Sequence, residues 1–205
     1  MNAEDPQSSG GPAGPANLPA SNPPFAIAKV ATFDDPWAMA FLPGSNRAIV
    51  TEKPGHIWIV DVNGGQKQPV SGVPRVVVNG QGGLLDVVLA PGFSSNGLLY
   101  LTYAEPSANG GSGLALARAK LVEDSRGVRL DGLQVLWRDP AGGQGGQFGA
   151  IAAIAPDGQS LFLSSGERQR FTPAQDPSQP IGKILHLTLD GKPAARNPWA
   201  GKTGA

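Results

Sequence analysis

The chain has 205 residues, and its 16 Lys and Arg residues balance 16 Asp and Glu residues, so the formal net charge is zero at pH 7. This balance gives no general electrostatic reason to expect binding to nucleic acid or to an anionic membrane. The absence of cysteine excludes a disulfide framework, a thiolate metal site and a cysteine nucleophile, and no apolar run approaches the ~20 residues of a membrane span.

Residues 1–24 are rich in proline and glycine and contain no apolar segment that could build a core. This composition predicts a disordered leader or linker that could be deleted with little effect on stability. It does not match a signal peptide as written. A start codon placed downstream of a lost signal would produce the same pattern, so that alternative stays open.

Short apolar runs separated by turn residues follow from about residue 25 onwards. In the first part of the chain, residues 38–42, 48–52 and 56–61 are expected to be strands, separated by Pro43-Gly44 and Pro54-Gly55 and followed by Asn63-Gly64. Runs of this length, rich in β-branched and aromatic residues and bounded by Pro-Gly or Asn-Gly, are typical of antiparallel hairpins.

The same arrangement occurs twice more. A glycine-rich segment with one glutamine begins each later unit, and an apolar strand, a proline turn and further strands follow. The expected strands are residues 87–90, 98–103, 114–119 and 133–137 in the second unit, and residues 150–154, 161–165 and 183–187 in the third.

Repetition of this pattern predicts the fold. Units of ~40–50 residues with three or four strands each are typical of β-propeller blades. A β-sandwich is the alternative, but sandwiches do not repeat a strand–turn–strand pattern at matching places. We therefore predict an all-β, incomplete propeller of about three blades of four-stranded antiparallel sheet, with approximate limits 25–79, 80–144 and 145–205.

The propeller arrangement would bring polar residues to one rim. In an antiparallel blade the start of the first strand and the end of the second lie at the same end, and the Pro-Gly turns lie at the opposite end. The residues expected on the polar rim are Trp37, Glu52, Gln81, Tyr103, Glu105, Gln147, Glu167 and Arg168. Convergent polar groups at the mouth of a β scaffold predict a binding site.

Several other chemistries lack support in the sequence. No Gly-x-Ser-x-Gly motif is present, and the two histidines, His56 and His186, lie in apolar strand contexts that favour a structural role. Two isolated histidines do not predict a zinc site. The glycine-rich segment 142–146 is followed by neither a helical pattern nor Lys-Ser/Thr, so it is not a dinucleotide or phosphate motif.

Several short sequence motifs of the chain resemble those of the soluble PQQ-dependent aldose sugar dehydrogenases, the glucose/sorbosone dehydrogenase family. The resemblance covers roughly residues 25–200 and is specific because many motifs occur in the same order. The matching motifs are residues 36–44, 50–55, 80–86, 99–104, 166–168, 174–176, 182–184, 190–193 and 197–198.

This resemblance implies the N-terminal half of a six-bladed propeller that holds PQQ and calcium on its axial rim. It also implies oxidation of a sugar to its lactone, an external electron acceptor, and a periplasmic or secreted location. By the same resemblance, Gln81 lines the cofactor and sugar pocket, and Arg168 lies near a second position that could bind a PQQ carboxylate. Further cofactor and calcium contacts are expected from family motifs beyond residue 205.

Gln147 stands where the family has its catalytic histidine. An amide cannot accept a proton at neutral pH, so Gln147 is expected to contact the sugar without acting as a competent base. Two alternatives therefore stay open. One is a calcium-dependent lactonase-like propeller with Glu52, Asp86, Glu105 and Glu167 as ligands, and the other is a non-catalytic sugar- or partner-binding propeller. Open propeller faces also predict self-association.

Overall fold

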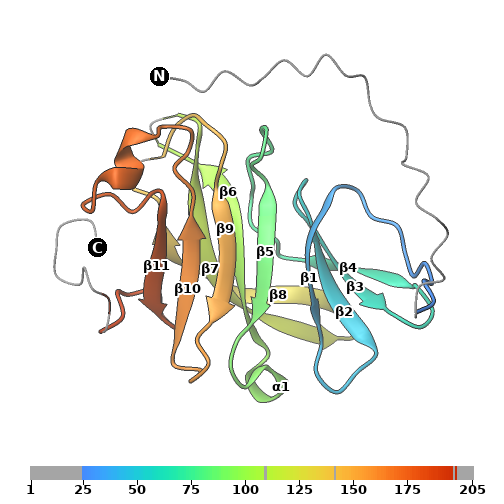
Figure 1. The fold of residues 1–205 in the computed structure, drawn as a ribbon. Helices are drawn as coiled ribbons and strands as arrows, with labels where there is room; N and C mark the ends of the chain where they lie inside the picture. The colour runs from blue at the N-terminus through green and yellow to red at the C-terminus, as the bar shows by residue number, and fades with distance from the viewer. Residues whose placement is uncertain (1–24, 109, 141, 196, 198–205) are drawn as a thin grey trace, which may run out of the picture.

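The structure is a computed structural model that describes residues 25–108, 110–140, 142–195 and 197. The predicted leader, residues 1–24, lies outside the described residues. The described chain is almost entirely β-structure, and its strands form three twisted groups that stand side by side (Figure 1). We call these groups blades 1, 2 and 3 in chain order.

Blade 1 is an antiparallel sheet of four strands, β1 (Pro36–Phe41), β2 (Arg47–Glu52), β3 (His56–Asp61) and β4 (Lys67–Ser71). The first three strands agree with the sequence prediction. Strand β4 was not predicted, because its sequence Lys-Gln-Pro-Val-Ser has one buried apolar residue, Val70, and no clear alternation. Pairing with β3 and with blade 2 makes this segment a strand.

Blade 2 contains the longest strands of the described chain. It consists of β5 (Leu84–Leu89), the short helix α1 (Phe93–Asn96), β6 (Leu98–Pro106), β7 (Ser112–Asp124) and β8 (Gly127–Arg138). The sequence analysis expected β7 and β8 to be about half as long. Their turn-proximal halves are rich in charged residues, but Val128 and Leu130 alternate with them and are buried in the core.

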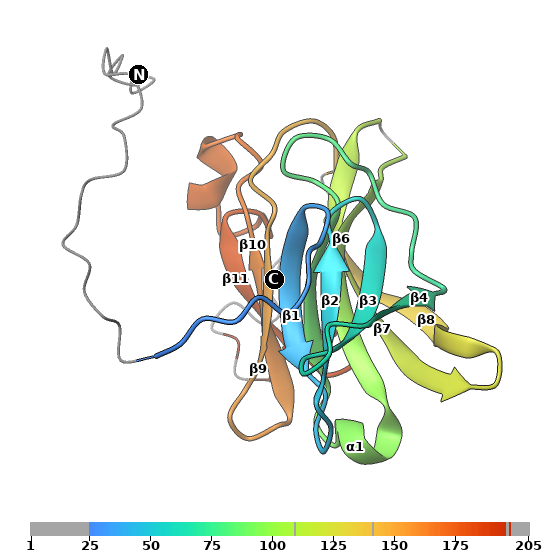
Figure 2. The same ribbon diagram turned by 90° about the vertical axis from the view of Figure 1, so that its right-hand side faces the viewer.

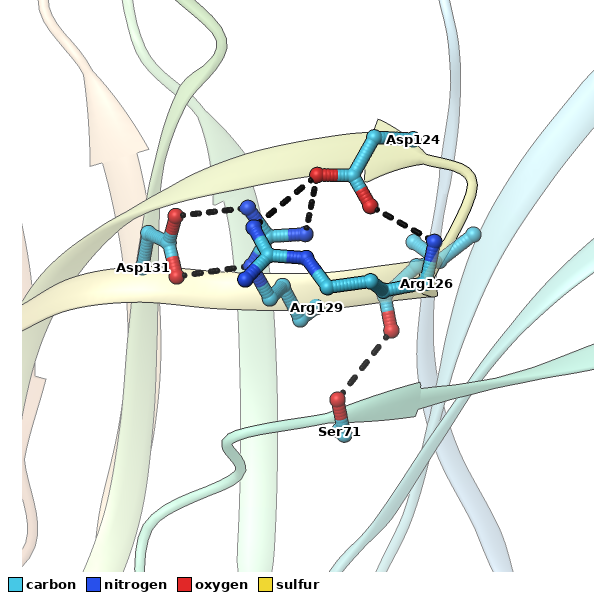
Figure 3. A network of polar contacts seen from close by, with 6 residues as sticks. Ser71, Asp124, Arg126, Arg129 and Asp131 are labelled. Carbon is cyan, nitrogen blue, oxygen red and sulfur yellow. Dashed lines mark hydrogen bonds and ion pairs between the residues drawn. The ribbon is translucent and has the colours of Figure 1, made fainter.

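An ion-pair network stabilises the polar end of this β7–β8 hairpin. The Arg129 guanidinium lies between the carboxylates of Asp124 (2.8 Å) and Asp131 (3.0 Å), and Arg126 also binds Asp124 (Figure 3). Beside this network β4 pairs in parallel with β8, and the Ser71 hydroxyl donates to the Val128 carbonyl. Blades 1 and 2 are thereby joined at their outer edges into one eight-stranded sheet.

Blade 3 has three described strands, β9 (Gly149–Ile154), β10 (Ser160–Ser165) and β11 (Lys183–Thr188), in the order β11-β10-β9. A 3-10 helix, η1 (Thr172–Gln175), interrupts the long connection between β10 and β11. The strands of all three blades fall inside the limits 25–79, 80–144 and 145–205, and those limits themselves stay a prediction.

Two apolar cores lie between the blades. Alternate residues of each strand point to opposite faces of the sheet, so a central blade contributes to both cores. The core between blades 1 and 2 includes Ile49, Ile57 and Leu101, and the core between blades 2 and 3 includes Tyr100, Leu116 and Leu163. This face-to-face packing of sheets confirms the predicted all-β propeller fold.

Hydroxyl groups cross both blade interfaces in the same way. The Thr51 hydroxyl on β2 donates to the Leu85 carbonyl on β5, and the Thr102 hydroxyl on β6 donates to the Ala150 carbonyl on β9, each at 2.7 Å. Both threonines are fully buried. Each of these bonds satisfies a backbone carbonyl that the apolar core would otherwise leave unpaired.

Within the described residues, no helix has the length and apolar character needed to cross a bilayer.

Candidate functional site

The loops that enter β5 and β9 lie at one end of the molecule. Figure 1 shows these loops and η1 at the top, and α1 and the β9–β10 turn at the bottom. The pairing of Pro36 with Glu52 and of Leu84 with Tyr103 places the start of each first strand beside the end of each second strand. The predicted polar rim therefore corresponds to one end of the blades.

Gln81 and Gln147 meet across the interface between blades 2 and 3. The side-chain oxygen Oε1 of Gln81 accepts a hydrogen bond of 2.5 Å from the backbone amide of Gln147. The side chain of Gln169 makes the matching contact one residue earlier, where its Oε1 accepts from the Gly146 amide at 2.9 Å. Two glutamine side chains therefore hold the loop that enters β9.

A hollow of about 320 Å³ opens beside these glutamines. Its lining consists of neutral amide side chains, one serine, one valine and several glycines, so it offers hydrogen-bond donors and acceptors without a charged side chain. Its lining residues are Val77, Asn79, Gly80, Gln81, Gly111, Ser112, Gly143, Gln144, Gly145, Gly146 and Gln169. Glycines let a ligand approach the backbone closely, so the hollow suits a flat or hydroxyl-rich ligand.

Left-handed backbone conformations gather around the same hollow. Gln147 has φ of 49°, and Arg168, Gln169 and Phe171 have φ of 59°, 57° and 55°. Such conformations cost roughly 1–3 kcal/mol each for residues other than glycine, and they cluster at functional sites where the surrounding structure enforces them. Their concentration in the loops after β10 and before β9 supports a functional rim.

Arg168 lies beneath the rim and is 1% exposed. Its guanidinium donates to the carbonyls of Gly145 (2.8 Å), Gly146 (3.1 Å) and Ser112 (3.1 Å) and lies 3.4 Å from the Asp139 carboxylate. The guanidinium also stacks on the Phe148 ring at 3.9 Å. Burial lowers the pKa of the Arg168 guanidinium, and the charge of Asp139 opposes that shift.

These contacts show that Arg168 has a structural role, because its N–H groups bind carbonyls of the glycine-rich loop 142–146 and hold this loop in place. The prediction that Arg168 binds a cofactor carboxylate stays a prediction. In the described conformation the guanidinium is covered, so a cofactor would have to displace the loop to reach it.

The acidic residues expected on the rim each have a separate set of contacts. The Glu167 carboxylate accepts from the amides of Gln169 (3.0 Å) and Phe171 (2.6 Å) and so stabilises its own loop. The Glu105 carboxylate lies 2.6 Å from Arg138 Nε. Glu52 is buried, accepts from the Asp34 amide at 2.8 Å and contacts His56 Nδ1 at 3.1 Å.

Asp86 connects blade 2 to blade 3. Its carboxylate accepts from the backbone amides of Ala152 (2.8 Å) and Val87 (2.9 Å), and burial raises its pKa in spite of these two bonds. In the part of the chain that the structure describes, no three His, Asp or Glu side chains converge as metal ligands. The lactonase alternative is therefore wrong in its ligand set, because Glu52, Asp86, Glu105 and Glu167 do not form one site.

The histidines and aromatic residues behave as structural groups. His186 stacks on Phe162 at 4.5 Å and contacts the Ser160 hydroxyl at 2.9 Å, and His56 contacts Glu52. Tyr103 is buried, and burial raises its pKa to about 12, with a further contribution from Glu105. Trp37 is 40% exposed on the edge strand β1.

Sequence reasoning missed Gln169 and the interface hydroxyls Thr51 and Thr102. Gln169 follows Arg168 in a loop without periodicity, and its contact with Gly146 depends on a left-handed φ that no sequence pattern indicates. The two threonines could have been found, because each is the last residue but one of the second strand predicted for its unit, residues 48–52 and 98–103. The signal is weak, because threonine is common in strands.

Comparison with known proteins identifies the family. Residues 33–205 match the Glucose / Sorbosone dehydrogenase family. The chain is 36% identical over 172 residues to the aldose sugar dehydrogenase YliI of Escherichia coli K12, and the match covers 84% of this chain and 46% of that protein. The chain therefore spans about half the length of the curated relatives it matches.

Solved structures agree with this result. The crystal structure of the soluble aldose sugar dehydrogenase of Escherichia coli in the apo-form superposes with a TM-score of 0.76 at 33% identity, covering 84% of this chain and 49% of that one. The PQQ-bound aldose sugar dehydrogenase of Streptomyces coelicolor superposes with a TM-score of 0.73 at 30% identity, covering 85% and 51%. Because the family match covers most of the chain and the solved relatives share its fold, the chain belongs to the glucose/sorbosone dehydrogenase family.

Proposed function

We propose that this chain takes part in PQQ-dependent oxidation of an aldose sugar to its lactone, with electrons passed to an external acceptor. The observation that supports this most directly is the contact between Gln81 and Gln147 beside the polar hollow. It places the two residues that the family resemblance assigns to the pocket next to each other, although 66 residues separate them in sequence.

The residues around the hollow fit a planar, oxygen-rich cofactor such as PQQ. Asn79, Gln81 and Gln144 can donate amide hydrogens to carbonyl or carboxylate oxygens, and the glycines at the lining allow a flat ring to approach the backbone. When bound, PQQ would supply the two-electron acceptor that a sugar oxidation needs. In this proposal Gln81 holds both the cofactor and the sugar, and Gln147 contacts the sugar.

Gln147 sets the expected rate. Its amide can hydrogen-bond a sugar hydroxyl but has no basic site near neutral pH, so it cannot remove the hydroxyl proton. General-base catalysis contributes ~10²–10⁴-fold in rate, so we expect binding to survive where turnover is slow. The Gln147 amide also favours the second candidate function, a sugar-binding module without catalysis.

The remaining parts of the proposal come from the family alone. A periplasmic or secreted location, a dedicated electron acceptor and a calcium ion next to the cofactor are proposed on that basis. No described residue is assigned to calcium, because the described side chains include no cluster that could hold a metal ion.

Cofactor binding is tested by titrating the 205-residue chain with PQQ and following tryptophan fluorescence. Gln81→Ala removes the side chain that touches the β9 loop and lines the hollow, and we expect PQQ affinity to fall about tenfold, as for loss of a good hydrogen bond. Gln134→Ala is the matched control, because Gln134 is an exposed glutamine on the outer strand β8. Equal affinities in the two variants would contradict the placement of the site.

Catalysis is tested by dye-linked oxidation of a panel of aldoses with added PQQ and calcium. We expect no turnover by the 205-residue chain. In a version extended by the family's remaining blades we expect slow turnover, and at least about a tenfold higher rate for its Gln147→His variant, since imidazole restores a general base. Brisk turnover with Gln147 in place would identify another residue as the base. PQQ-independent sugar binding with no turnover in either protein would favour the binding module.

A further inference from the structure

The oxygen atoms of the Gln81 and Gln169 side chains are both turned towards the loop that enters β9. Each Oε1 accepts from a backbone amide of that loop, and a Cβ placed on Gly146 would lie 3.1 Å from one oxygen and 3.5 Å from the other. An amide side chain combines one acceptor oxygen with an NH2 group that carries two donors. Neither NH2 group has an acceptor among the described residues, so each glutamine offers donors to a ligand in the hollow.

The carbonyls of the glycine-rich loop 142–146 each contact an arginine of blade 3. Arg168 lies beneath the loop, and Arg170 follows it along the same segment. The contacts join Arg168 to Gly143 (3.4 Å), Gly145 (2.8 Å) and Gly146 (3.1 Å), and Arg170 to Gly142 and Gln144 (3.5 Å). The carbonyls of this loop are therefore already paired and add few acceptors to the hollow.

The backbone amides of the same loop are in the opposite state. Those of Gly143, Gln144 and Gly145 donate to no described residue, and all three residues line the hollow. Successive backbone N–H groups in turn conformations form concavities that bind anions. Together with the two glutamine NH2 groups, these amides give the hollow an excess of donors.

Arg170 brings a positive charge to the edge of the hollow. Its Nη2 would lie 3.0 Å from a Cβ on Gly143, so the glycine places no side chain between this guanidinium and the hollow. Figure 2, turned by 90° from Figure 1, again shows η1 and the loop that enters β9 at the same end of the molecule. Arg170 lies in the connection just before η1.

No carboxylate of the described residues forms an ion pair with Arg170. The nearby Asp139 pairs with Arg168, and the Glu167 carboxylate accepts from backbone amides of its own loop. Burial lowers the pKa of the Arg168 guanidinium, and the positive charge of Arg170 acts in the same direction against the charge of Asp139. Two cations therefore lie close together here with one paired carboxylate between them, and an added anion would relieve their repulsion.

We propose that the hollow binds its ligand through a carboxylate group, which Arg170 and the amides of residues 143–145 hold. The ligand in question is PQQ, a planar tricarboxylate, so this site rests on the proposed function. A carboxylate only accepts hydrogen bonds and so matches an excess of donors, whereas sugar hydroxyls would also need acceptors. Every group involved lies between blades 2 and 3, both of which are described, so these contacts do not depend on any further blade.

The carboxylate is tested by calorimetric titration of the 205-residue chain with PQQ and with PQQ trimethyl ester, in which the charges are removed. We expect the parent chain to bind PQQ at least about tenfold more tightly than the ester, because hydrogen bonds to a charged group are the stronger ones. Arg170→Gln should weaken PQQ binding by about tenfold and leave ester binding unchanged, and Arg170→Lys should recover part of the loss. Arg126→Gln is the matched control, because it removes the same charge from a side chain that is 74% exposed on the β7–β8 hairpin.

The acid and the ester separate a contact with the ligand from support of the loop. If Arg170 only held the loop, Arg170→Gln would weaken both ligands equally, and that result would overturn the carboxylate contact. Equal binding of PQQ and its ester by the parent, which needs no variant, would also overturn it and leave PQQ binding itself intact.

A smaller probe, pyridine-2,4,6-tricarboxylate, distinguishes this site from the proposed function. If the parent bound this probe through Arg170 but did not bind PQQ, the carboxylate site would stand and the proposed cofactor would be wrong. A parent chain that bound neither compound would refute the carboxylate site.

Discussion

The hydroxyl of Thr102 gives the sharpest test of how the blades are joined. It donates to the Ala150 carbonyl at 2.7 Å and accepts from the Asp86 amide at 2.9 Å, and both Thr102 and Ala150 are 0% exposed. The substitution Thr102→Val keeps the shape of the side chain and removes only the polar atom. It therefore leaves one carbonyl and one amide without this partner in the interior.

The expected cost follows from these two groups. Each buried polar group left unpaired lowers the free energy of unfolding by about 1–3 kcal/mol. Burial of the added methyl group raises it by about 0.8 kcal/mol. The net loss in free energy of unfolding is thus about 1–5 kcal/mol, a large part of the ~5–15 kcal/mol that a domain has. Thr102→Ser keeps both hydrogen bonds and should lose only about 1 kcal/mol for its missing methyl group.

The assay is urea unfolding followed by tryptophan fluorescence, at one fixed protein concentration so that any association contributes equally to all variants. With a slope of ~2 kcal/mol/M, Thr102→Val should lower the midpoint by about 0.5–2.5 M. Thr188→Val is the control, because the Thr188 hydroxyl accepts one amide, that of Lys192, at 3.2 Å on an exposed turn. If Thr102→Val and Thr188→Val shifted the midpoint equally, the hydroxyl would not be joining the blades.

Three further outcomes concern buried charges, all measured by urea unfolding. Arg168→Met should cost about 3–5 kcal/mol, because it leaves the Asp139 carboxylate buried beside an apolar side chain. Burial acts to raise the pKa of Glu52, but contacts with Trp58, the Asp34 amide and His56 outweigh burial and hold the pKa below the ordinary value of a glutamate. The ionised Glu52 carboxylate therefore stabilises the folded chain above the ordinary pKa of a glutamate, and this contribution is lost as pH falls through the lowered pKa, so the stability of Glu52→Gln should be less sensitive to acid than that of the parent. The raised pKa of Asp86 has the opposite sign, and Asp86→Asn should gain stability relative to the parent as pH rises above about 3.8.

The strand positions were largely predictable from the sequence because each blade buries alternate residues against its neighbours. Short β-branched runs between Pro-Gly turns identify β2, β3, β6, β9 and β10 for this reason. The signal is weak where a strand is stabilised by pairing instead of burial. Thus β4 was missed. The turn-proximal ends of β7 and β8 were also left out, because the charged residues around Arg129 obscure the alternation of the buried Val128 and Leu130.

The candidate site shows the same division. Gln81 and Gln147 could be predicted as rim residues because each follows glycines and precedes an apolar first strand, so repeating units place them at the same end. Their direct contact, the contribution of Gln169 and the burial of Arg168 depend on left-handed loop conformations and on the distance between blades. Contacts between loops 66 residues apart leave no periodic pattern in either loop.

The sequence by itself therefore determined the number of blades, the rim on which polar residues gather and the family, because these depend on local patterns that repeat along the chain. Only the tertiary structure decided what each polar side chain does. Burial converts Arg168 from a candidate ligand into a support for the loop beneath the hollow, and it separates Glu52, Asp86, Glu105 and Glu167 into unrelated contacts. The physical reason is that a polar group in a packed interior must bind whatever partner the neighbouring blade brings within reach, and that partner is set by three-dimensional packing.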